Sequence, residues 1–324
     1  MNTFQRLRST IGRSFLALLA FSLVGHAVAA NLKIIVPASA GGGWDQLGRA
    51  TQQSMQAAKL AEQIQVSNIP GAGGTIGLAT LHNTHKGDPN ALMVSGKGML
   101  SAIVINKSPI DLSQVVPIAR LTGEYEVIVV PTESKIKTMA DLIAQYKANP
   151  GSVSWGGGLA GGVDMLTAGM IIQAIGGDAS KLNYVAFGGG GEVLTAAAGG
   201  HITAGVGGYN EFAQQIKGGK LRALGITSDK RLAGVDIPTL KEQGINVEFV
   251  NWRGLMAPAG ISDAQRQEMV KKVTEMSKSE QWRAILTKND WTDLFLAGDD
   301  FTSYVETEQK NVKSLVHTLG LVKK

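Results

Sequence analysis

The stretch Lys33-Ile-Ile-Val-Pro-Ala-Ser-Ala-Gly-Gly-Gly-Trp-Asp45 decides the fold. An apolar strand runs into a proline, then into three glycines, and then into the start of a helix. Glycine allows positive φ and lets the backbone approach a ligand closely. A helix that begins there points unpaired N–H groups and the positive end of its dipole at the same place. The stretch therefore predicts a strand–turn–helix unit whose backbone can hold a small anion.

The same strand–glycine–helix pattern recurs three times along the chain. It returns at Ile69-Pro-Gly-Ala-Gly-Gly-Thr75, at Ser154-Trp-Gly-Gly-Gly-Leu-Ala-Gly-Gly162 and at Val185-Ala-Phe-Gly-Gly-Gly-Gly191. One such turn alone is an ordinary tight connection. Four of them favour a binding site, because ligands of open α/β sheets bind beyond the carboxyl ends of the strands, where these turns lie.

Strand-like and helix-like runs alternate, which predicts an α/β fold with mostly parallel sheets flanked by helices. A Thr138–Asn149 helix is the clearest element, because Thr138 can cap it and Asp141 stands three residues later. The other expected strands are Leu32–Val36, Ile64–Ile69, Ala91–Ser95, Glu126–Val130, Ser152–Trp155, Leu182–Phe187, Ile202–Val206 and Leu221–Thr227, with Val247–Met256 extended. The other expected helices are Trp44–Ala58, one opening at Thr75–Leu81, Val163–Ile175, Glu192–Ala198, Ser262–Met276, Ser279–Thr287 and Asp299–Leu319.

We expect two domains, with the second inserted into the first. Domain 1 would comprise residues 31–130 plus 252–324, and domain 2 residues 131–251. Two crossing segments, near Glu126–Thr132 and Val247–Gly254, would form the hinge. The alternative is one continuous doubly wound sheet.

Residues 1–30 read as a secretory signal peptide. Three arginines precede the apolar run Phe15–Val24, which is short for a membrane span, and Ala27-Val28-Ala29 is an A-x-A cleavage signal. We expect cleavage near Ala29 or Ala30 and a periplasmic mature protein, the alternative being a short membrane anchor. The chain has no cysteine, which excludes disulfides, a lipid anchor on cysteine and thiolate chemistry.

The charge balance excludes a nucleic-acid partner. The chain carries 31 Lys and Arg against 26 Asp and Glu, and loss of the three N-terminal arginines leaves 28 against 26. The near balance and the lack of a basic stripe with interleaved aromatic residues give no footprint for nucleic acid.

One sequence motif leaves open the alternative that the protein is an enzyme. Gly156-x-Gly158-x-x-Gly161 follows a strand, precedes a helix and matches the dinucleotide fingerprint. The acid that should end the next strand is missing, because Leu182–Phe187 runs into glycines. No phosphate-binding P-loop, nucleophile elbow or patterned metal-ligating histidine pair is present in the sequence, so we expect no catalytic residues, no metal and no cofactor.

Side chains around the first glycine turn have two readings each. Ser39 would add a hydroxyl to the anion cradle of Gly41–Gly43, and Asp45 would either cap its helix or accept a hydrogen bond from the ligand. Arg253 would be a counter-charge for the ligand or part of an interdomain salt bridge. The tryptophans Trp44, Trp155 and Trp252 would line the cleft or fill the core.

Five segments together resemble the periplasmic receptors of tripartite tricarboxylate transporters, also called Bug-type receptors. They are Val36-Pro-Ala-Ser-Ala-Gly-Gly-Gly-Trp-Asp45 followed by Arg49, Asn68-Ile-Pro-Gly-Ala-Gly-Gly-Thr-Ile-Gly77, Val153-Ser-Trp-Gly-Gly-Gly158, Asp236-Ile-Pro-Thr-Leu-Lys-Glu-Gln-Gly244 and Asn251-Trp-Arg-Gly254. The resemblance covers essentially the whole mature chain.

The resemblance implies a two-domain, type II Venus flytrap fold in which one loop of each domain grips a carboxylate. Many members have Ser or His in the second loop, whereas this chain has Leu159-Ala160-Gly161-Gly162-Val163-Asp164, which makes backbone donors and water more important here. The ligand-binding residues that the resemblance carries over are Ser39, Ala40, Gly41, Gly42, Gly43, Trp44, Asp45, Gly73, Gly74, Thr75, Gly157, Gly158, Gly161, Gly162, Asp164, Gly189 and Gly190, to which our reading of the residues adds Arg253.

The resemblance further implies a monomeric receptor, not an enzyme, that binds a di- or tricarboxylate such as citrate, or an amino acid, and delivers it to membrane transporter subunits. Two alternatives stay open at this point. The glycine motif of Gly156–Gly161 leaves an exported nucleotide-dependent oxidoreductase, and the closure of a receptor equally suits a sensor that presents its ligand to a membrane kinase.

Overall fold

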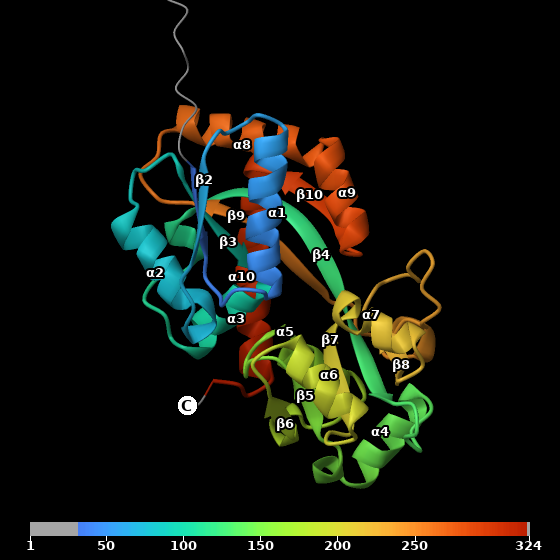
Figure 1. Ribbon diagram of the computed structural model, residues 1–324. Coiled ribbons are helices and arrows are strands. Elements are labelled where there is room, and N and C mark those ends of the chain that lie inside the picture. The colour runs from blue at the N-terminus through green and yellow to red at the C-terminus, as the bar shows by residue number, and fades with distance from the viewer. Residues whose placement is uncertain (1–31, 323–324) are drawn as a thin grey trace, which may run out of the picture.

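The computed structural model describes residues 32–322, which form one curled sheet between helices (Figure 1). The expected signal peptide lies outside the described residues. Among residues 32–322, no helix combines the length and the apolar character that a membrane crossing requires.

The sheet has two halves, which share the long strand β4 (Val116–Pro131). The β1–β3 half contains the strands that pair with the first part of β4 or with its neighbours, namely β1 (Leu32–Val36), β2 (Ile64–Asn68), β3 (Ala91–Gly96), β9 (Val250–Ala257) and β10 (Thr292–Ala297). The β5–β7 half contains β5 (Trp155–Gly157), β6 (Tyr184–Ala186), β7 (Ala204–Gly208) and β8 (Leu221–Ile226).

Strand directions place the carboxyl ends of both sets of parallel strands face to face. Strand β9 is antiparallel to both β3 and β4, so β1–β3 point the same way as β4, toward the β5–β7 half. Strands β5, β6 and β7 are parallel to one another and β7 is antiparallel to β4, so these three point back toward the β1–β3 half. We call the region between these facing strand ends the junction.

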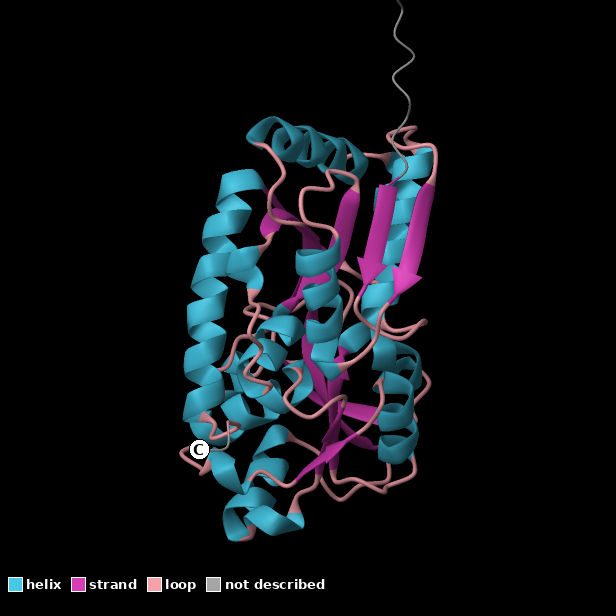
Figure 2. Cartoon of the chain, turned by 90° about the vertical axis from the view of Figure 1, so that its left-hand side faces the viewer, coloured by secondary structure: helices cyan, strands magenta, loops and turns pink. Residues whose placement is uncertain are grey.

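Helices cover both faces of the strands, as Figure 2 shows. Those connecting the β1–β3 half are α1 (Gly43–Ala57), α2 (Thr75–Thr84), α3 (Lys97–Ile105), α8 (Asp263–Ser277), α9 (Glu280–Lys288) and α10 (Gly298–Thr318). Those of the β5–β7 half are α4 (Met139–Ala148), α5 (Val163–Ala174), α6 (Gly190–Ala198) and α7 (Tyr209–Lys217). Short 3₁₀ turns are η1 (Ala72–Gly74), η2 (Leu112–Gln114), η3 (Pro150–Ser152), η4 (Ala179–Lys181) and η5 (Lys241–Gln243).

Local sequence explains the helices that were predicted. Helix α1 buries Leu47, Ala50, Thr51, Ser54 and Met55, a spacing of three and four residues that puts one face on the sheet. Helix α4 begins with the expected capping box, in which Thr138 and Asp141 each satisfy the other's backbone N–H.

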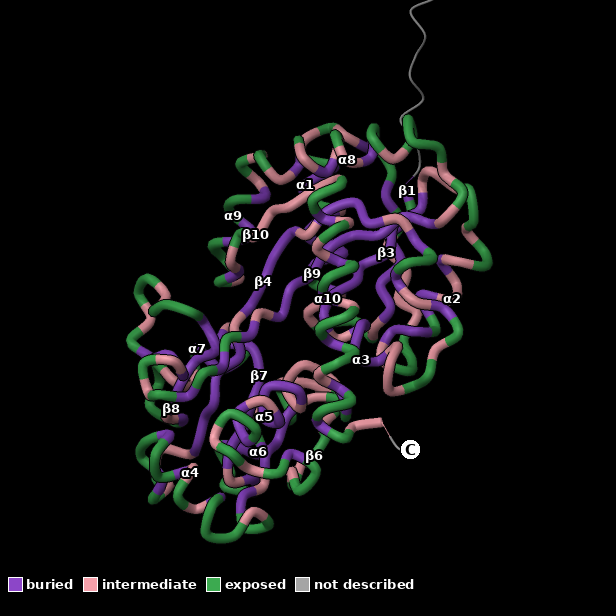
Figure 3. The backbone as a smooth tube through the Cα atoms, turned by 180° about the vertical axis from the view of Figure 1, so that it is seen from behind, coloured by how far each residue is buried: buried purple, intermediate pink, exposed green. Residues whose placement is uncertain are grey.

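The core runs through both halves. One cluster joins Met93 of β3, Ile128 of β4 and Trp155 of β5, while others lie under α1 and under α7. Figure 3 shows β4 buried along most of its length. The last helix, α10, spans the two halves, since Leu319 just beyond it lies against Gly169 of α5.

The fold class is confirmed, but several details differ from the sequence-based expectations. The sheet is mixed, because β4, β8, β9 and β10 make antiparallel pairs. Strand β4 is far longer than the expected Glu126–Val130, because Arg120, Glu124 and Glu126 interrupt its apolar run while its backbone continues in the sheet. The elements α3, α7 and β10 were not predicted. Helix α3 contains three consecutive β-branched residues, Ile103-Val104-Ile105, so its apolar residues do not show the spacing of an amphipathic helix.

Candidate functional site

The glycine turns lie at the junction, because they follow β1, β2, β5 and β6. The first loop, Ser39–Asp45, leaves Ser39, Ala40, Gly41 and Gly42 exposed and half-buries Gly43 and Trp44. Helix α1 begins at Gly43, so the first backbone N–H groups of this helix have no partner within it. These donors and the positive end of the helix dipole are what a carboxylate needs.

The Asp45 side chain holds the first loop in shape through hydrogen bonds. Its Oδ2 accepts hydrogen bonds from the Gly41 N–H and from Arg49 Nε, both at 2.9 Å, and its Oδ1 accepts one from Asn68 Nδ2 at 2.9 Å. Burial acts to raise the pKa of Asp45, but the Arg49, Gly41 and Asn68 donors outweigh it and lower the pKa. Gly41 has a φ of +89°, which only glycine adopts without strain. The Asp45 carboxylate therefore shapes the loop, but it does not cap α1, whose N-cap Gly42 has no side-chain partner.

Two further loops are closed in the same manner. The Gly158 N–H donates to Asp164 Oδ2 at 2.6 Å, and the Gly188 N–H donates to Glu192 Oε2 at 3.0 Å. In each case the acceptor stands in the first turn of the helix that follows, α5 or α6, where a carboxylate also complements the helix dipole. First-turn acids thus fix the shape of three of the four glycine turns.

The Ala72–Thr75 turn supports the first loop from behind. A Cβ on Gly74, whose φ is +96°, would lie 2.6 Å from the Trp44 ring. The Thr75 hydroxyl donates to the Ala72 carbonyl at 3.0 Å, and Gly73 lies against Ala102 of α3. The structure therefore places Gly73, Gly74 and Thr75 in contacts that hold Trp44 and α3.

The second loop is packed against the opposite half of the sheet. The Ser101 hydroxyl of α3 donates to the Gly161 carbonyl, and the Gly162 N–H donates to the Leu159 carbonyl at 2.8 Å. Gly157 belongs to β5 and is buried, with Asp164 and the Tyr184 hydroxyl against it. Leu159 at the tip of this loop is exposed.

Arg253 lies at the centre of the junction. A Cβ on Gly43 would lie 2.6 Å from its Cζ, so the guanidinium sits directly beneath the start of α1. Its two terminal nitrogens bind the carboxylate of Glu124 at 2.5 and 3.0 Å, and both residues are buried. Arg253 therefore forms a salt bridge, but this bridge joins β9 to β4 within the expected domain 1 and is not the interdomain salt bridge that was expected.

Three more carboxyl groups surround this ion pair. Glu126 follows Glu124 on the same face of β4, Asp164 comes from α5, and Glu211 stands in the first turn of α7. A Cβ on Gly190 would lie 2.6 Å from Glu211 Cδ, which brings the fourth glycine turn to the same place. Gly189 beside it faces open space.

Charge crowding shifts the proton affinities of these groups. Burial, followed by the charges of Asp164, Glu124 and Glu211, raises the pKa of Glu126 well above its usual range. Burial also raises the pKa of Asp164. Partial removal from water, followed by the charges of Asp164 and Glu124, raises the pKa of Glu211 to about 7, although the residue as a whole is exposed. Perturbed groups of this kind gather at functional sites more often than elsewhere.

Of the residues predicted for the site, the structure brings Gly43, Gly157, Gly158, Asp164, Gly190 and Arg253 together around one centre. Glu124, Glu126 and Glu211 lie there too and were missed. The signal was present for the first two, since two glutamates alternate with apolar residues inside a buried strand. Among residues 32–322, no set of three or more acidic or histidine side chains has the geometry of a metal site.

The tryptophans divide between the two readings. Trp155 and Trp252 are buried in the core, and Trp252 Nε1 donates to Glu308 at 3.0 Å. Trp44 is half-buried beside the first loop. Trp155 and Trp252 therefore fill the core, whereas Trp44 borders the first loop.

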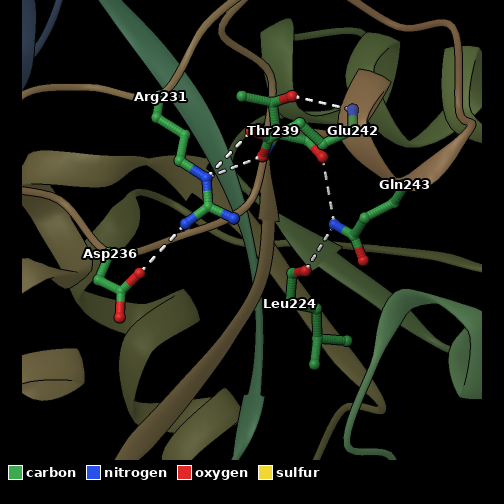
Figure 4. Close-up of polar contacts among 6 residues, drawn as sticks. All are labelled: Leu224, Arg231, Asp236, Thr239, Glu242 and Gln243. Carbon is green, nitrogen blue, oxygen red and sulfur yellow. Dashed lines mark hydrogen bonds and ion pairs between the residues drawn. The ribbon is translucent and has the colours of Figure 1, made fainter.

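The Asp236–Gly244 motif, which carried part of the resemblance, forms a hydrogen-bonded turn in the β5–β7 half (Figure 4). Thr239 and Glu242 exchange hydrogen bonds in a capping box, and Arg231 binds Glu242 and Asp236. Gln243 donates to the Leu224 carbonyl at 3.0 Å, which ties the turn to β8. The role of this motif is structural.

Comparisons with known proteins agree with the geometry. A family model described as a tripartite tricarboxylate transporter family receptor matches residues 47–321. Protein BugT of Bordetella pertussis is 30% identical over 237 residues, which cover 71% of each chain.

The crystal structure of a TctC solute-binding protein from Polaromonas is 26% identical, covers 89% of this chain and 98% of that one, and has a TM-score of 0.72. MatC from Rhodopseudomonas palustris, with bound malate, is 21% identical, covers 88% and 98%, and has a TM-score of 0.74. The matching family model describes receptors and not enzymes, so the dinucleotide reading of Gly156–Gly161 is not supported.

Proposed function

The chain belongs to the family of tripartite tricarboxylate transporter receptors, and on this premise we propose that it captures a small carboxylate at the junction and delivers it to a membrane transporter of that type. The observation that carries the proposal is the arrangement of the turns. The glycine turns of both sheet halves face one another across the Arg253 centre. Ligands of open α/β sheets bind at such strand ends.

The proposal treats the two halves of the sheet as the two domains of a flytrap, comprising residues 31–130 plus 252–324 and residues 131–251. Strand β4 crosses between them near Tyr125, and the chain returns at Val250, where pairing of β9 with β4 begins. These two crossing strands would form the hinge. The end of α10 rests on α5, so this helix would limit the opening.

The chemistry of capture follows from the helix starts. A ligand carboxylate would accept hydrogen bonds from the N–H groups at the start of α1, near Gly42 and Gly43, and from those at the start of α6, near Gly189 and Gly190. Each charge-assisted bond contributes about 1.5–3 kcal/mol. A micromolar receptor needs about 8 kcal/mol, so a few such bonds suffice after the cost of closure.

Support for a dicarboxylate comes from the malate bound to MatC, which shares this fold. Support for a periplasmic location comes from the family, together with the signal peptide expected in residues 1–30. Citrate and other tricarboxylates remain in the proposed class because the backbone cradle recognises only the carboxylate group.

Two glycine variants test the cradle without disturbing the fold. A Cβ on Gly42 would meet only the Ser39 carbonyl at 3.9 Å, and a Cβ on Gly189 would meet nothing within 4 Å. Gly42→Val and Gly189→Val should therefore fold normally and place their methyl groups where the carboxylate would sit. Gly157→Val is unsuitable, because its Cβ would lie 2.6 Å from Asp164 Cβ.

Calorimetry on the mature chain would first find ligands from a panel of di-, tri- and aminocarboxylates, and then measure both variants. We expect at least tenfold weaker binding in each. Gly151→Val is the matched control, because this exposed glycine lies in η3, away from the junction, with its nearest contact at 3.5 Å. Unchanged affinity in both junction variants would rule out the cradle.

A further inference from the structure

The end of α10 fits into a gap on the other half of the sheet. Leu319, the C-cap residue of this helix, is only 1% exposed. A Cβ added to Gly169 of α5 would lie 2.8 and 3.1 Å from the two methyl carbons of Leu319. The three heavy atoms nearest to such a Cβ all belong to Leu319. The Leu319 side chain therefore fills the space that a glycine leaves open on α5, and we call this space the notch.

The turn after α10 fixes the direction in which the chain ends. Gly320 has a φ of +66°, and the N–H groups of Gly320 and Leu321 donate to carbonyls of the last turn of α10 at 3.0 and 3.1 Å. This pattern is a Schellman motif, in which glycine adopts the left-handed conformation that ends a helix. Leu321 and Val322 are half-buried and pack on the apolar cluster that includes α5. The end of the chain is therefore attached to the β5–β7 half.

The middle of α10 is attached to the β1–β3 half instead. Glu308 is buried, and its Oε2 binds Lys97 Nζ at the start of α3 and accepts a hydrogen bond from Trp252 Nε1 of β9, both at 3.0 Å. Leu319 stands eleven residues after Glu308, which is about 17 Å along a helix. One rigid helix is thus anchored in one half by a buried carboxylate and seated in the other half by an apolar side chain.

The Leu319 contact lies away from the strands that cross between the halves. In Figure 1 the red end of α10 lies beside α5, to the left of the place where β4 crosses. A rotation of the β5–β7 half about β4 and β9 moves α5 relative to α10, so it has to withdraw Leu319 from the notch. Close-packed apolar contacts are lost when a gap opens between them.

We propose that Leu319 is a latch that holds the two halves in the closed arrangement by seating in the notch of Gly169. The inference rests on the proposed function, because a receptor that encloses its ligand between two halves needs an open and a closed arrangement. The apparent dissociation constant increases as the closed fraction of the ligand-free protein falls. The latch therefore sets the affinity without touching the ligand.

Two substitutions weaken the latch in different ways. Leu319→Ala empties the notch, and Gly169→Ala fills it. Alanine is the better helix former, so Gly169→Ala should stabilise α5 itself while it disfavours the closed arrangement. If Leu319 were an ordinary core residue, stability and affinity would change in the same direction in both variants. Gly169→Ala also keeps the test decisive if Leu319→Ala folds poorly.

Opening is measured on the mature, ligand-free protein by the distance between two spin labels. The chain has no cysteine, so Asn83→Cys on α2 and Gln173→Cys on α5, both exposed, give one label on each half without background. Pulsed electron resonance should show a larger population at long distance in both latch variants than in the parent. Leu286→Ala is the control, because Leu286 is buried in a cluster of the β1–β3 half alone, and it should lower stability while the distances stay unchanged.

Calorimetry with the carboxylate panel measures the effect on binding. Each latch variant should raise the dissociation constant at least about threefold, and by the same factor for every ligand, because only the closed fraction changes. The double variant should bind no more weakly than Leu319→Ala alone, since the atoms that crowd an alanine at Gly169 belong to Leu319.

The outcomes separate the latch from the proposed function. If both variants keep the distances of the parent, the latch is wrong, whether or not a carboxylate binds. If the distances lengthen and the parent binds no carboxylate, the latch stands and the carboxylate function is wrong. Longer distances with unchanged affinity, or additive losses in the double variant, would overturn the latch and leave the carboxylate receptor in place.

Discussion

Arg253 of β9 and Glu124 of β4 form a two-pronged ion pair, at 2.5 and 3.0 Å, where the chain crosses between the two halves of the sheet. Asn210, next to the start of α7, adds a hydrogen bond to Glu124 at 3.3 Å, and Gly43 at the start of α1 lies on the guanidinium. One buried pair thus connects the two strands that join the halves with two of the helix starts at the junction.

Removing the acid of this pair should destabilise the protein strongly. Glu124→Gln leaves Arg253 buried without its counter-charge, and breaking a buried ion pair from one side costs about 3–5 kcal/mol. We expect a loss of about 3 kcal/mol, because Glu126 is close enough to take part of the charge. Urea unfolding of the ligand-free protein measures this free energy.

The control for this prediction is an exposed ion pair. Glu248→Gln removes one of two acids at Lys241, which keeps Asp229, and should leave the urea midpoint unchanged. If Glu124→Gln is as stable as Glu248→Gln, the buried pair does not hold the junction together.

The crowded carboxyl groups give stability a defined pH dependence. A carboxyl group whose pKa is higher in the folded than in the unfolded chain binds its proton more tightly when folded. Its stabilising effect is complete below the unfolded pKa, near 4.5 for Glu126 and Glu211, and is lost as the pH rises through the folded value, which is about 7 for Glu211. The melting temperature of the ligand-free protein should therefore fall between pH 5 and pH 8.

Glu126→Gln should flatten that pH profile, because the amide does not ionise. Melting curves by circular dichroism at half-unit pH steps would compare it with the parent and with Glu275→Gln, which should keep the full slope. A parent protein whose melting temperature rises across this range would contradict the raised pKa values.

Neighbouring glycines of the first loop should respond differently to the same substitution. A Cβ at Gly42 has open space, whereas one at Gly43 would lie 2.6 Å from Arg253 Cζ. Gly43→Ala should displace the guanidinium and cost about 1–3 kcal/mol. Gly42→Ala should change the free energy of unfolding by less than about 0.5 kcal/mol, as is usual away from buried contacts. Equal effects in urea unfolding would mean that Arg253 does not lie beneath α1.

Much of this architecture was predictable because it depends on local pattern. The β1 strand follows from its apolar run and the start of α4 from the capping box at Thr138, while the start of α5 at Val163 follows from the glycines that precede it. The resemblance supplied the family and the fold class. Charged residues in the middle of β4 concealed its length, since a buried glutamate resembles a strand end in sequence.

The site was predictable only in its backbone. Glycine turns after β1, β5 and β6 indicate where helices begin, but they do not indicate which side chains from other segments lie near those helix starts. Glu124, Asp164, Glu211 and Arg253 come from four distant segments, and their proximity depends on strand order and direction. The sequence alone therefore does not show that these four charged side chains lie next to one another.

A single hydrogen bond between the halves should favour closure of the receptor. The Ser101 hydroxyl of α3 is buried and donates to the Gly161 carbonyl of the second loop, beside the contact between Ile105 and Gly161. Ser101→Ala removes a bond that an opened form would lack, so it should shift the protein toward that form. A net contribution of about 0.5–1.5 kcal/mol corresponds to a dissociation constant raised about two- to tenfold.

Calorimetry with the best ligand of the panel would measure that dissociation constant, and small-angle scattering would show a larger radius of gyration in the ligand-free variant. Ser108→Ala is the control, because the Ser108 hydroxyl donates to the Ile110 carbonyl at 2.7 Å within one turn of the same half. A dissociation constant that changes equally in both variants would show that the Ser101 bond does not act through closure.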